Sequence, residues 1–155
     1  NLAQRFGLGS RDIGLAFGAM ALAHTLSSPF MGRLSDRIGR ARVLRIGLAA
    51  SVVLMPLPAL LPSPWTVGLA MMALGFNASF LLSPCSPAVA DQVERMDSQS
   101  FASGFSILNI AYSVGMALGP LLSGPIIDVL GFGGALAVVG AASGLFLFAT
   151  RGINT

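Results

Sequence analysis

Polar side chains that could contact a small organic molecule recur inside long apolar stretches of this chain. One stretch carries His24, Ser27 and Ser28 at positions i, i+3 and i+4, a spacing that places all three on one face of a helix. Two further stretches carry comparable hydroxyl, amide and phenol groups: Asn77, Ser79, Ser83 and Ser86 in one, and Ser106, Asn109, Tyr112 and Ser113 in the other. Such groups can donate or accept hydrogen bonds.

The apolar stretches around these groups are long enough to cross a membrane. A polar side chain inside a membrane is costly and usually faces a bundle interior or a water-filled cavity. We therefore predict that four of these side chains line a cavity: His24, Asn77, Asn109 and Tyr112. The alternative is that these groups and the neighbouring serines only form hydrogen bonds between helices.

The composition indicates an integral membrane protein. Of the 155 residues, 54% are hydrophobic and only 10% are charged, whereas an average soluble domain is about 25% charged. The basic pI comes from nine arginines without a lysine, five of them within residues 33–45, so it does not indicate a nucleic-acid partner. With one histidine, one cysteine and no nucleophile–base pair, we expect no enzyme activity, metal site or cofactor.

Five helices are predicted to cross the membrane, because each needs about 20 apolar residues. They cover residues 13–31, 43–61, 65–90, 101–127 and 129–150, and short loops make neighbouring helices antiparallel. The second and fifth helices carry few polar groups and are expected to pack on the outside of an all-α bundle formed by residues 1–155. Because the chain starts at Asn1 inside a polar stretch, we interpret it as a piece of a longer protein.

The arginines predict the orientation of these helices. Seven of the nine fall on one side of the membrane, in the first loop, the third loop and the C-terminal segment. By the positive-inside rule the first loop and the C-terminus are cytoplasmic, in a multi-pass protein of the cell (inner) membrane. An odd number of helices then puts the N-terminus outside, and a sixth helix before Asn1 would restore an internal start.

The first loop carries a motif. Its segment Gly32-Arg33-Leu34-Ser35-Asp36-Arg37-Ile38-Gly39-Arg40-Ala41-Arg42 resembles the signature loop of the major facilitator superfamily, with Ala41 at a usually basic position. In this interpretation Gly32 allows close helix approach and Gly39 permits the turn. Asp36 pairs with Arg37 or Arg40, or lies at the N-terminus of a neighbouring helix. The resemblance implies that these residues latch one conformation of a transporter.

A second motif lies in the fourth helix. Gly115, Gly119, Pro120 and Gly124 resemble the antiporter motif of the same superfamily, with Ser123 in place of one glycine. Small residues four apart form a groove for a neighbouring backbone, and Pro120 is expected to bend the helix. Leucine at Gly119 should therefore harm the protein more than leucine at Gly140 on the predicted outer helix.

The resemblance covers essentially the whole chain and implies a twelve-helix secondary transporter, of which this chain is one six-helix half without its first helix. The absence of an arginine at Met71 and the Ser83-Pro84 pair favour the carboxy-terminal half, and the drug and monoamine antiporter branch is the most similar. Implied partners are the other half, a small-molecule substrate and protons. The chain offers only His24 as a titratable group inside the membrane, so a coupling acid is expected elsewhere.

Other readings of the sequence predict different observations. A uniporter or symporter for a sugar or organic acid should lack the Gly-Pro motif. A non-transporting sensor or assembly protein should lack a hydrated cavity.

Overall fold

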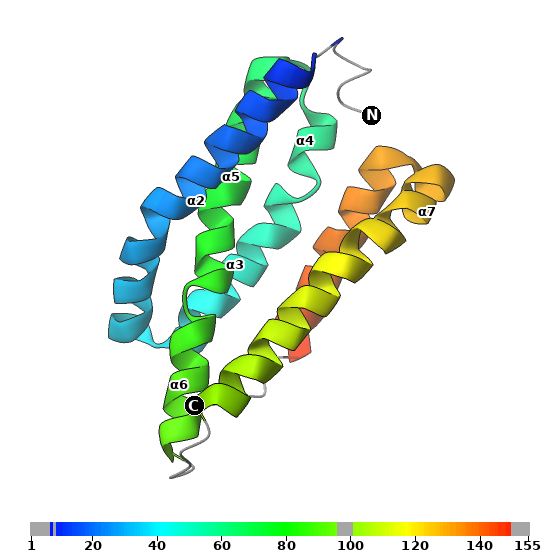
Figure 1. Cartoon of the computed structure of the whole chain (residues 1–155). Helices are drawn as coiled ribbons and strands as arrows, with labels where there is room; N and C mark the ends of the chain where they lie inside the picture. The colour runs from blue at the N-terminus through cyan, green and yellow to red at the C-terminus, as the bar shows by residue number, and fades with distance from the viewer. Residues whose placement is uncertain (1–6, 8, 96–100, 150–155) are drawn as a thin grey trace.

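The computed structural model describes residues 7, 9–95 and 101–149, and in this part the chain is entirely α-helical apart from turns (Figure 1). The helices are α2 (Ser10–Ile38), α3 (Arg40–Leu54), α4 (Leu57–Leu60), α5 (Pro64–Leu82), α6 (Cys85–Arg95) and α7 (Phe101–Ala149). The predicted all-α fold is therefore confirmed.

Four helical segments are long and apolar enough to cross a membrane: Ser10–Ile38, Arg40–Leu60, Pro64–Glu94 and Ala102–Ala149. The last has 48 residues and would be about 72 Å long if straight, more than twice the hydrocarbon thickness of about 30 Å. It turns back at Gly131, which has φ 71°, so α7 consists of a first arm (residues 101–130) and an antiparallel second arm (residues 132–149) (Figure 1). Each arm is long enough to cross, which accounts for the five predicted spans.

Several predicted helix boundaries were wrong. The segment expected as a loop between residues 31 and 43 is helical on both sides of Gly39, whose φ of 95° makes it the turn. The turn within α7 lies at Gly131 instead of residue 128, because glycine accepts a positive φ without steric cost.

Prolines divide two of the predicted spans. The helix expected over residues 43–61 ends at Leu54, and α4 follows after Pro56. The helix expected over residues 65–90 ends at Leu82, and α6 begins after the turn at Ser83 and Pro84. A proline lacks the backbone N–H and clashes with the preceding turn, which favours a break at these points.

The packing centres on α5, which lies between α2 and α3, while α7 packs against α3 and α6. Glycines permit the closest approaches. A Cβ at Gly75 would clash with the Met20 carbonyl of α2, and one at Gly47 would lie 2.8 Å from the Phe80 Cβ. Small residues at helix contacts are typical of membrane bundles, where dispersion contacts supply much of the attraction.

The second arm of α7 is exposed at more than half of its positions, and its expected place on the outside of the bundle stays a prediction. It lies against α3, where a Cβ at Gly140 would be 3.2 Å from the Val52 carbonyl oxygen. The first arm is exposed along nearly all of its length. Large apolar side chains also face outward on other helices, for example Leu22 and Leu69. This exposure is what a helix that contacts lipid or another membrane segment requires.

Candidate functional site

The signature segment forms a tight helical corner at one end of the bundle. Helix α2 continues through Asp36 and Arg37 to Ile38, Gly39 makes the turn, and α3 begins at Arg40. Gly32 has open space around the position of a Cβ, so the expected close helix approach at Gly32 is absent from the described part of the structure. Gly39 was expected to permit the turn, and its positive φ of 95° agrees with this role.

Arg40 is the charged centre of this corner. Its guanidinium Nη1 lies 2.7 Å from Oδ2 of Asp91 on α6, and its Nη2 lies 3.7 Å from Oδ1 of Asp36, one turn before it. The Arg40 side chain is only 25% exposed, whereas those of Asp36 and Asp91 are 62% and 46% exposed. Arg40 therefore connects the α2–α3 corner to α6, which follows the next span.

Asp36 was predicted to pair with Arg37 or Arg40, and it does approach Arg40. The shorter contact of Arg40 with Asp91 was not predicted. Asp91 stands 51 positions after Arg40, and only the antiparallel return of α5 and α6 brings it to the same end of the bundle. The one feature of the sequence that could have indicated this contact is the cluster of charged residues that ends the third apolar stretch.

Two pairs of buried polar side chains hold α5 against its neighbours. The Asn77 amide Nδ2 donates a hydrogen bond of 2.7 Å to Ser51 Oγ on α3. On the opposite side of α5, Ser79 Oγ lies 3.0 Å from Ser27 Oγ of α2. All four residues are at most 7% exposed. In this structure these groups form hydrogen bonds between helices. Ser51 belongs to the second predicted helix, for which no role of polar side chains was expected.

The four residues predicted to line a cavity do not come together in the described part of the structure. Asn77 is buried between α5 and α3, and His24 is half-buried on α2, where its Nδ1 is buried without a hydrogen-bond partner among the described residues. Asn109 and Tyr112 are exposed on the first arm of α7. Helices α2 and α7 lie on opposite sides of α5 and α3 (Figure 1). The lining role of these residues stays a prediction.

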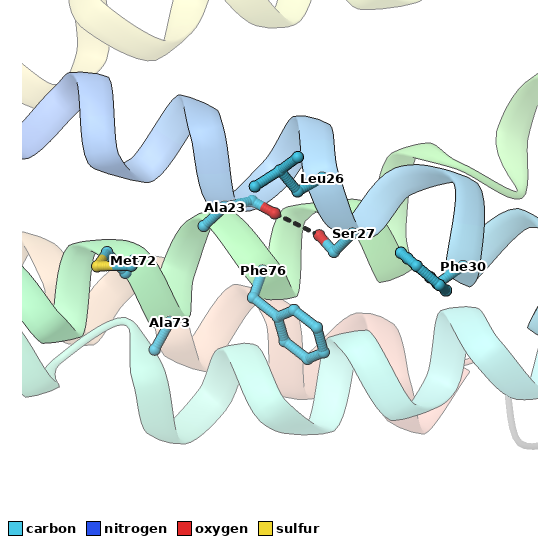
Figure 2. A pocket seen from close by; sticks show the side chains of 7 residues that line it. All are labelled: Ala23, Leu26, Ser27, Phe30, Met72, Ala73 and Phe76. Atoms are coloured by element: carbon cyan, nitrogen blue, oxygen red, sulfur yellow. Dashed lines mark hydrogen bonds between the residues drawn. The ribbon is translucent and has the colours of Figure 1, made fainter.

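An open groove of about 490 Å³ runs between α2 and α5 (Figure 2). Helix α2 contributes Ala23, Leu26, Ser27 and Phe30, and α5 contributes Met72, Ala73 and Phe76. The Ser27 hydroxyl lies 2.6 Å from the Ala23 carbonyl oxygen of its own helix, a contact drawn in Figure 2. The lining is therefore almost wholly apolar, and it has no motif that the sequence analysis could have used.

The antiporter-like motif lies on the exposed first arm of α7. A Cβ at Gly115, Gly119 or Gly124 would meet no atom within 4 Å. The backbone stays helical through Pro120, and the one non-helical position found within α7 is Gly131. The small-residue face is thus open, and any segment that packs on it lies outside the described residues.

The described residues contain no group of three His, Cys, Asp or Glu side chains that could hold a metal ion.

Comparisons with known proteins agree with the fold. The family model described as Major Facilitator Superfamily matches residues 1–152. The chain is 29% identical over 124 residues to the multi-drug resistance efflux pump PmrA homolog of Lactococcus lactis, which covers 79% of this chain and 30% of that protein. No solved structure gives a significant match.

Two mammalian relatives are similar at comparable identity. The chromaffin granule amine transporter of Rattus norvegicus is 26% identical over 130 residues, covering 83% of this chain and 25% of the relative. The human MFS-type transporter SLC18B1 is 28% identical over 152 residues, covering 88% and 33%. The chain therefore spans about a quarter to a third of the length of these curated relatives.

Proposed function

Because the chain belongs to the major facilitator superfamily, we propose that the complete protein is a secondary active transporter that expels small organic molecules or drugs in exchange for protons. Relatives described as a multi-drug efflux pump and as an amine transporter support this substrate class. The chain supplies one part of the transporter, and the remaining helices, including the other transmembrane half and a coupling acid, lie outside it. We place the Gly39 corner and the C-terminus on the cytoplasmic side of the cell (inner) membrane.

The ion pair between Arg40 and Asp91 is the observation that carries the mechanism. In alternating access, two bundles rock around a central substrate site, so the contacts at the cytoplasmic end of the transporter differ between the two states. Arg40 lies at the end of the bundle, it is mostly buried, and it connects two different spans through an exposed carboxylate. We assign Arg40 and Asp91 as the latch, with Asp36 as a weaker second partner, Arg37 beside it and Gly39 as the turn.

We assign further roles to two groups of residues. His24, Asn77, Asn109 and Tyr112 are our candidates for the substrate cavity, which would need α7 to lie nearer to α2 or an additional helix between them. The small-residue face with Gly115, Gly119 and Gly124 is open, and we propose that it packs against the other half, with Pro120 in the same seam. The Gly-Pro motif favours an antiporter over a uniporter or symporter.

A transport assay on the full-length protein tests this proposal. The purified protein is placed in liposomes loaded with a panel of fluorescent organic amines, and a pH gradient is imposed across the membrane. Proton-coupled efflux predicts that at least one amine moves only while the gradient is present and stops when a protonophore is added. Movement that does not depend on the gradient would indicate a uniporter, and no movement of any amine by correctly inserted protein would contradict the proposed substrate class.

A further inference from the structure

Two arginines on α2 have no acidic partner among the described residues. Arg33 and Arg37 are exposed, whereas the neighbouring Asp36 is directed to Arg40, which also holds Asp91. The two arginines are four residues apart, so they share a helix face and their like charges repel each other. Arg42, on the first turn of α3, adds another exposed positive charge across the Gly39 turn. This corner therefore carries an excess of positive charge.

The same face of α2 is apolar further into the membrane. Leu26 and Phe30 precede Arg33 and Arg37 at spacings of four, three and four residues, so all four side chains lie along one stripe. Leu26 and Phe30 are 68% and 65% exposed. Both also line the groove between α2 and α5 (Figure 2), and Phe30 is the α2 lining residue nearest to Arg33 in the sequence. The apolar groove thus leads toward the cationic pair.

The order of the apolar groove and the two arginines along α2 matches the hydrocarbon and headgroup layers of a bilayer. Helix α2 has 29 residues and is about 43 Å long, so it exceeds the hydrocarbon thickness of about 30 Å and its last turns reach the headgroup layer. An apolar groove at hydrocarbon depth that ends in arginines at headgroup depth is complementary to an amphiphile with an acyl chain and an anionic head.

We propose that Arg33, Arg37 and the groove between α2 and α5 form a binding site for an anionic phospholipid. One acyl chain lies in the groove against Phe30 and Phe76, and the two guanidinium groups bind the phosphate. The planar guanidinium fork matches phosphate oxygens with two hydrogen bonds, which the point charge of a lysine does not. If the two arginines only oriented the helix in the membrane, positive charge alone would be sufficient. Exchange of both arginines for lysine keeps the charge but removes the guanidinium groups, so it distinguishes orientation from phosphate binding.

Binding of a defined lipid to the full-length protein tests the site. The purified protein in detergent is titrated with dioleoylphosphatidylglycerol, and bound lipid is counted by native mass spectrometry. The expected result is at least tenfold weaker binding in the Arg33→Gln/Arg37→Gln variant and a few-fold weaker binding in the Arg33→Lys/Arg37→Lys variant. The matched control is Arg11→Gln, an exposed arginine at the other end of α2, which should change binding less than twofold.

Two further arms distinguish the other possible occupants. Ala73→Phe fills the groove and should weaken phosphatidylglycerol binding although both arginines remain. Glycerol 3-phosphate, which has the phosphate without acyl chains, should neither bind at the same concentration nor displace the lipid. Displacement by glycerol 3-phosphate, equal losses in Arg11→Gln and the double variant, or unchanged binding in the double-glutamine and Ala73→Phe variants would each overturn the proposal. If the glutamine variant does not fold, unchanged binding in the lysine variant overturns it.

Discussion

At the scale of single residues, buried hydrogen bonds between helices decide where α5 sits. Asn77 and Ser79 are two residues apart and point to opposite sides of α5, one to Ser51 of α3 and the other to Ser27 of α2. In a membrane an unpaired polar group has no water to replace the lost partner, which makes such pairs specific. Measured interhelical hydrogen bonds are nevertheless modest, about 0.6 kcal/mol on average.

A double-mutant cycle on Asn77 and Ser51 tests this assignment. Asn77→Ala and Ser51→Ala should each lower the free energy of unfolding, and the double variant should cost less than the sum of the two single changes. The expected coupling is about 0.5–1 kcal/mol, measured by reversible unfolding in detergent. Ser106→Ala is the control, because among the described residues its hydroxyl donates a hydrogen bond to the Ala102 carbonyl of its own helix. Strict additivity for Asn77 and Ser51 would show that the observed hydrogen bond does not contribute to stability.

At the scale of helices, glycine contacts set the distances between elements. Gly75 allows α5 to approach the Met20 carbonyl of α2, whereas Gly68 on the same helix has open space around it. Alanine at Gly75 must push two backbones apart, and overpacking of this kind costs about 1–3 kcal/mol. We expect Gly75→Ala to lower the melting temperature and the yield of folded protein, while Gly68→Ala leaves both unchanged. Equal behaviour of the two variants would contradict the described α2–α5 contact.

The second arm of α7 gives another test at this scale. Gly140 lies against the Val52 carbonyl of α3, and Ala142 on the same arm is exposed. Leucine at Gly140 should separate the second arm from α3 and sharply reduce the folded fraction, whereas Ala142→Leu should be tolerated. The readout is the monodisperse fraction in size-exclusion chromatography. Tolerance of Gly140→Leu would contradict the described contact between the second arm and α3.

The sequence predicted the helical fold because apolar stretches of sufficient length leave few alternatives in a membrane. It predicted the Gly39 turn because this glycine lies at a span boundary, in the segment that resembles the signature loop. It did not predict the Arg40–Asp91 contact or the groove between α2 and α5, because both depend on which faces of distant helices meet. It misplaced the turn in α7 by three residues, since Asp128 and Gly131 both lie at the end of an apolar run.

At the scale of the whole molecule, the alternation of helices predicts which ends share a side of the membrane. The Gly39 turn and α6 lie at one end, and the segment between α4 and α5 lies at the other end together with the Gly131 turn (Figure 1). Ser35, a natural choice for a label, is only 1% exposed. Gln92→Cys and Pro62→Cys, both at exposed positions, should therefore be used in a Cys85→Ser background. Impermeant maleimide should label Pro62→Cys from outside intact cells and Gln92→Cys only after permeabilisation. Labelling of both from one side would contradict the topology.

The most direct test of the account is transport by charge-exchange variants of Arg40 and Asp91 in the full-length protein. Because the pair lies between two spans, Arg40→Asp and Asp91→Arg should each reduce gradient-driven amine efflux from liposomes about tenfold or more at equal insertion, and the double exchange should recover a substantial part. Asp36→Asn should also reduce efflux, though less than Asp91→Asn, because Asp36 is farther from Arg40 and more exposed. The account predicts recovery in the double exchange. Single variants as active as the wild type, or a double exchange as inactive as the single variants, would contradict it.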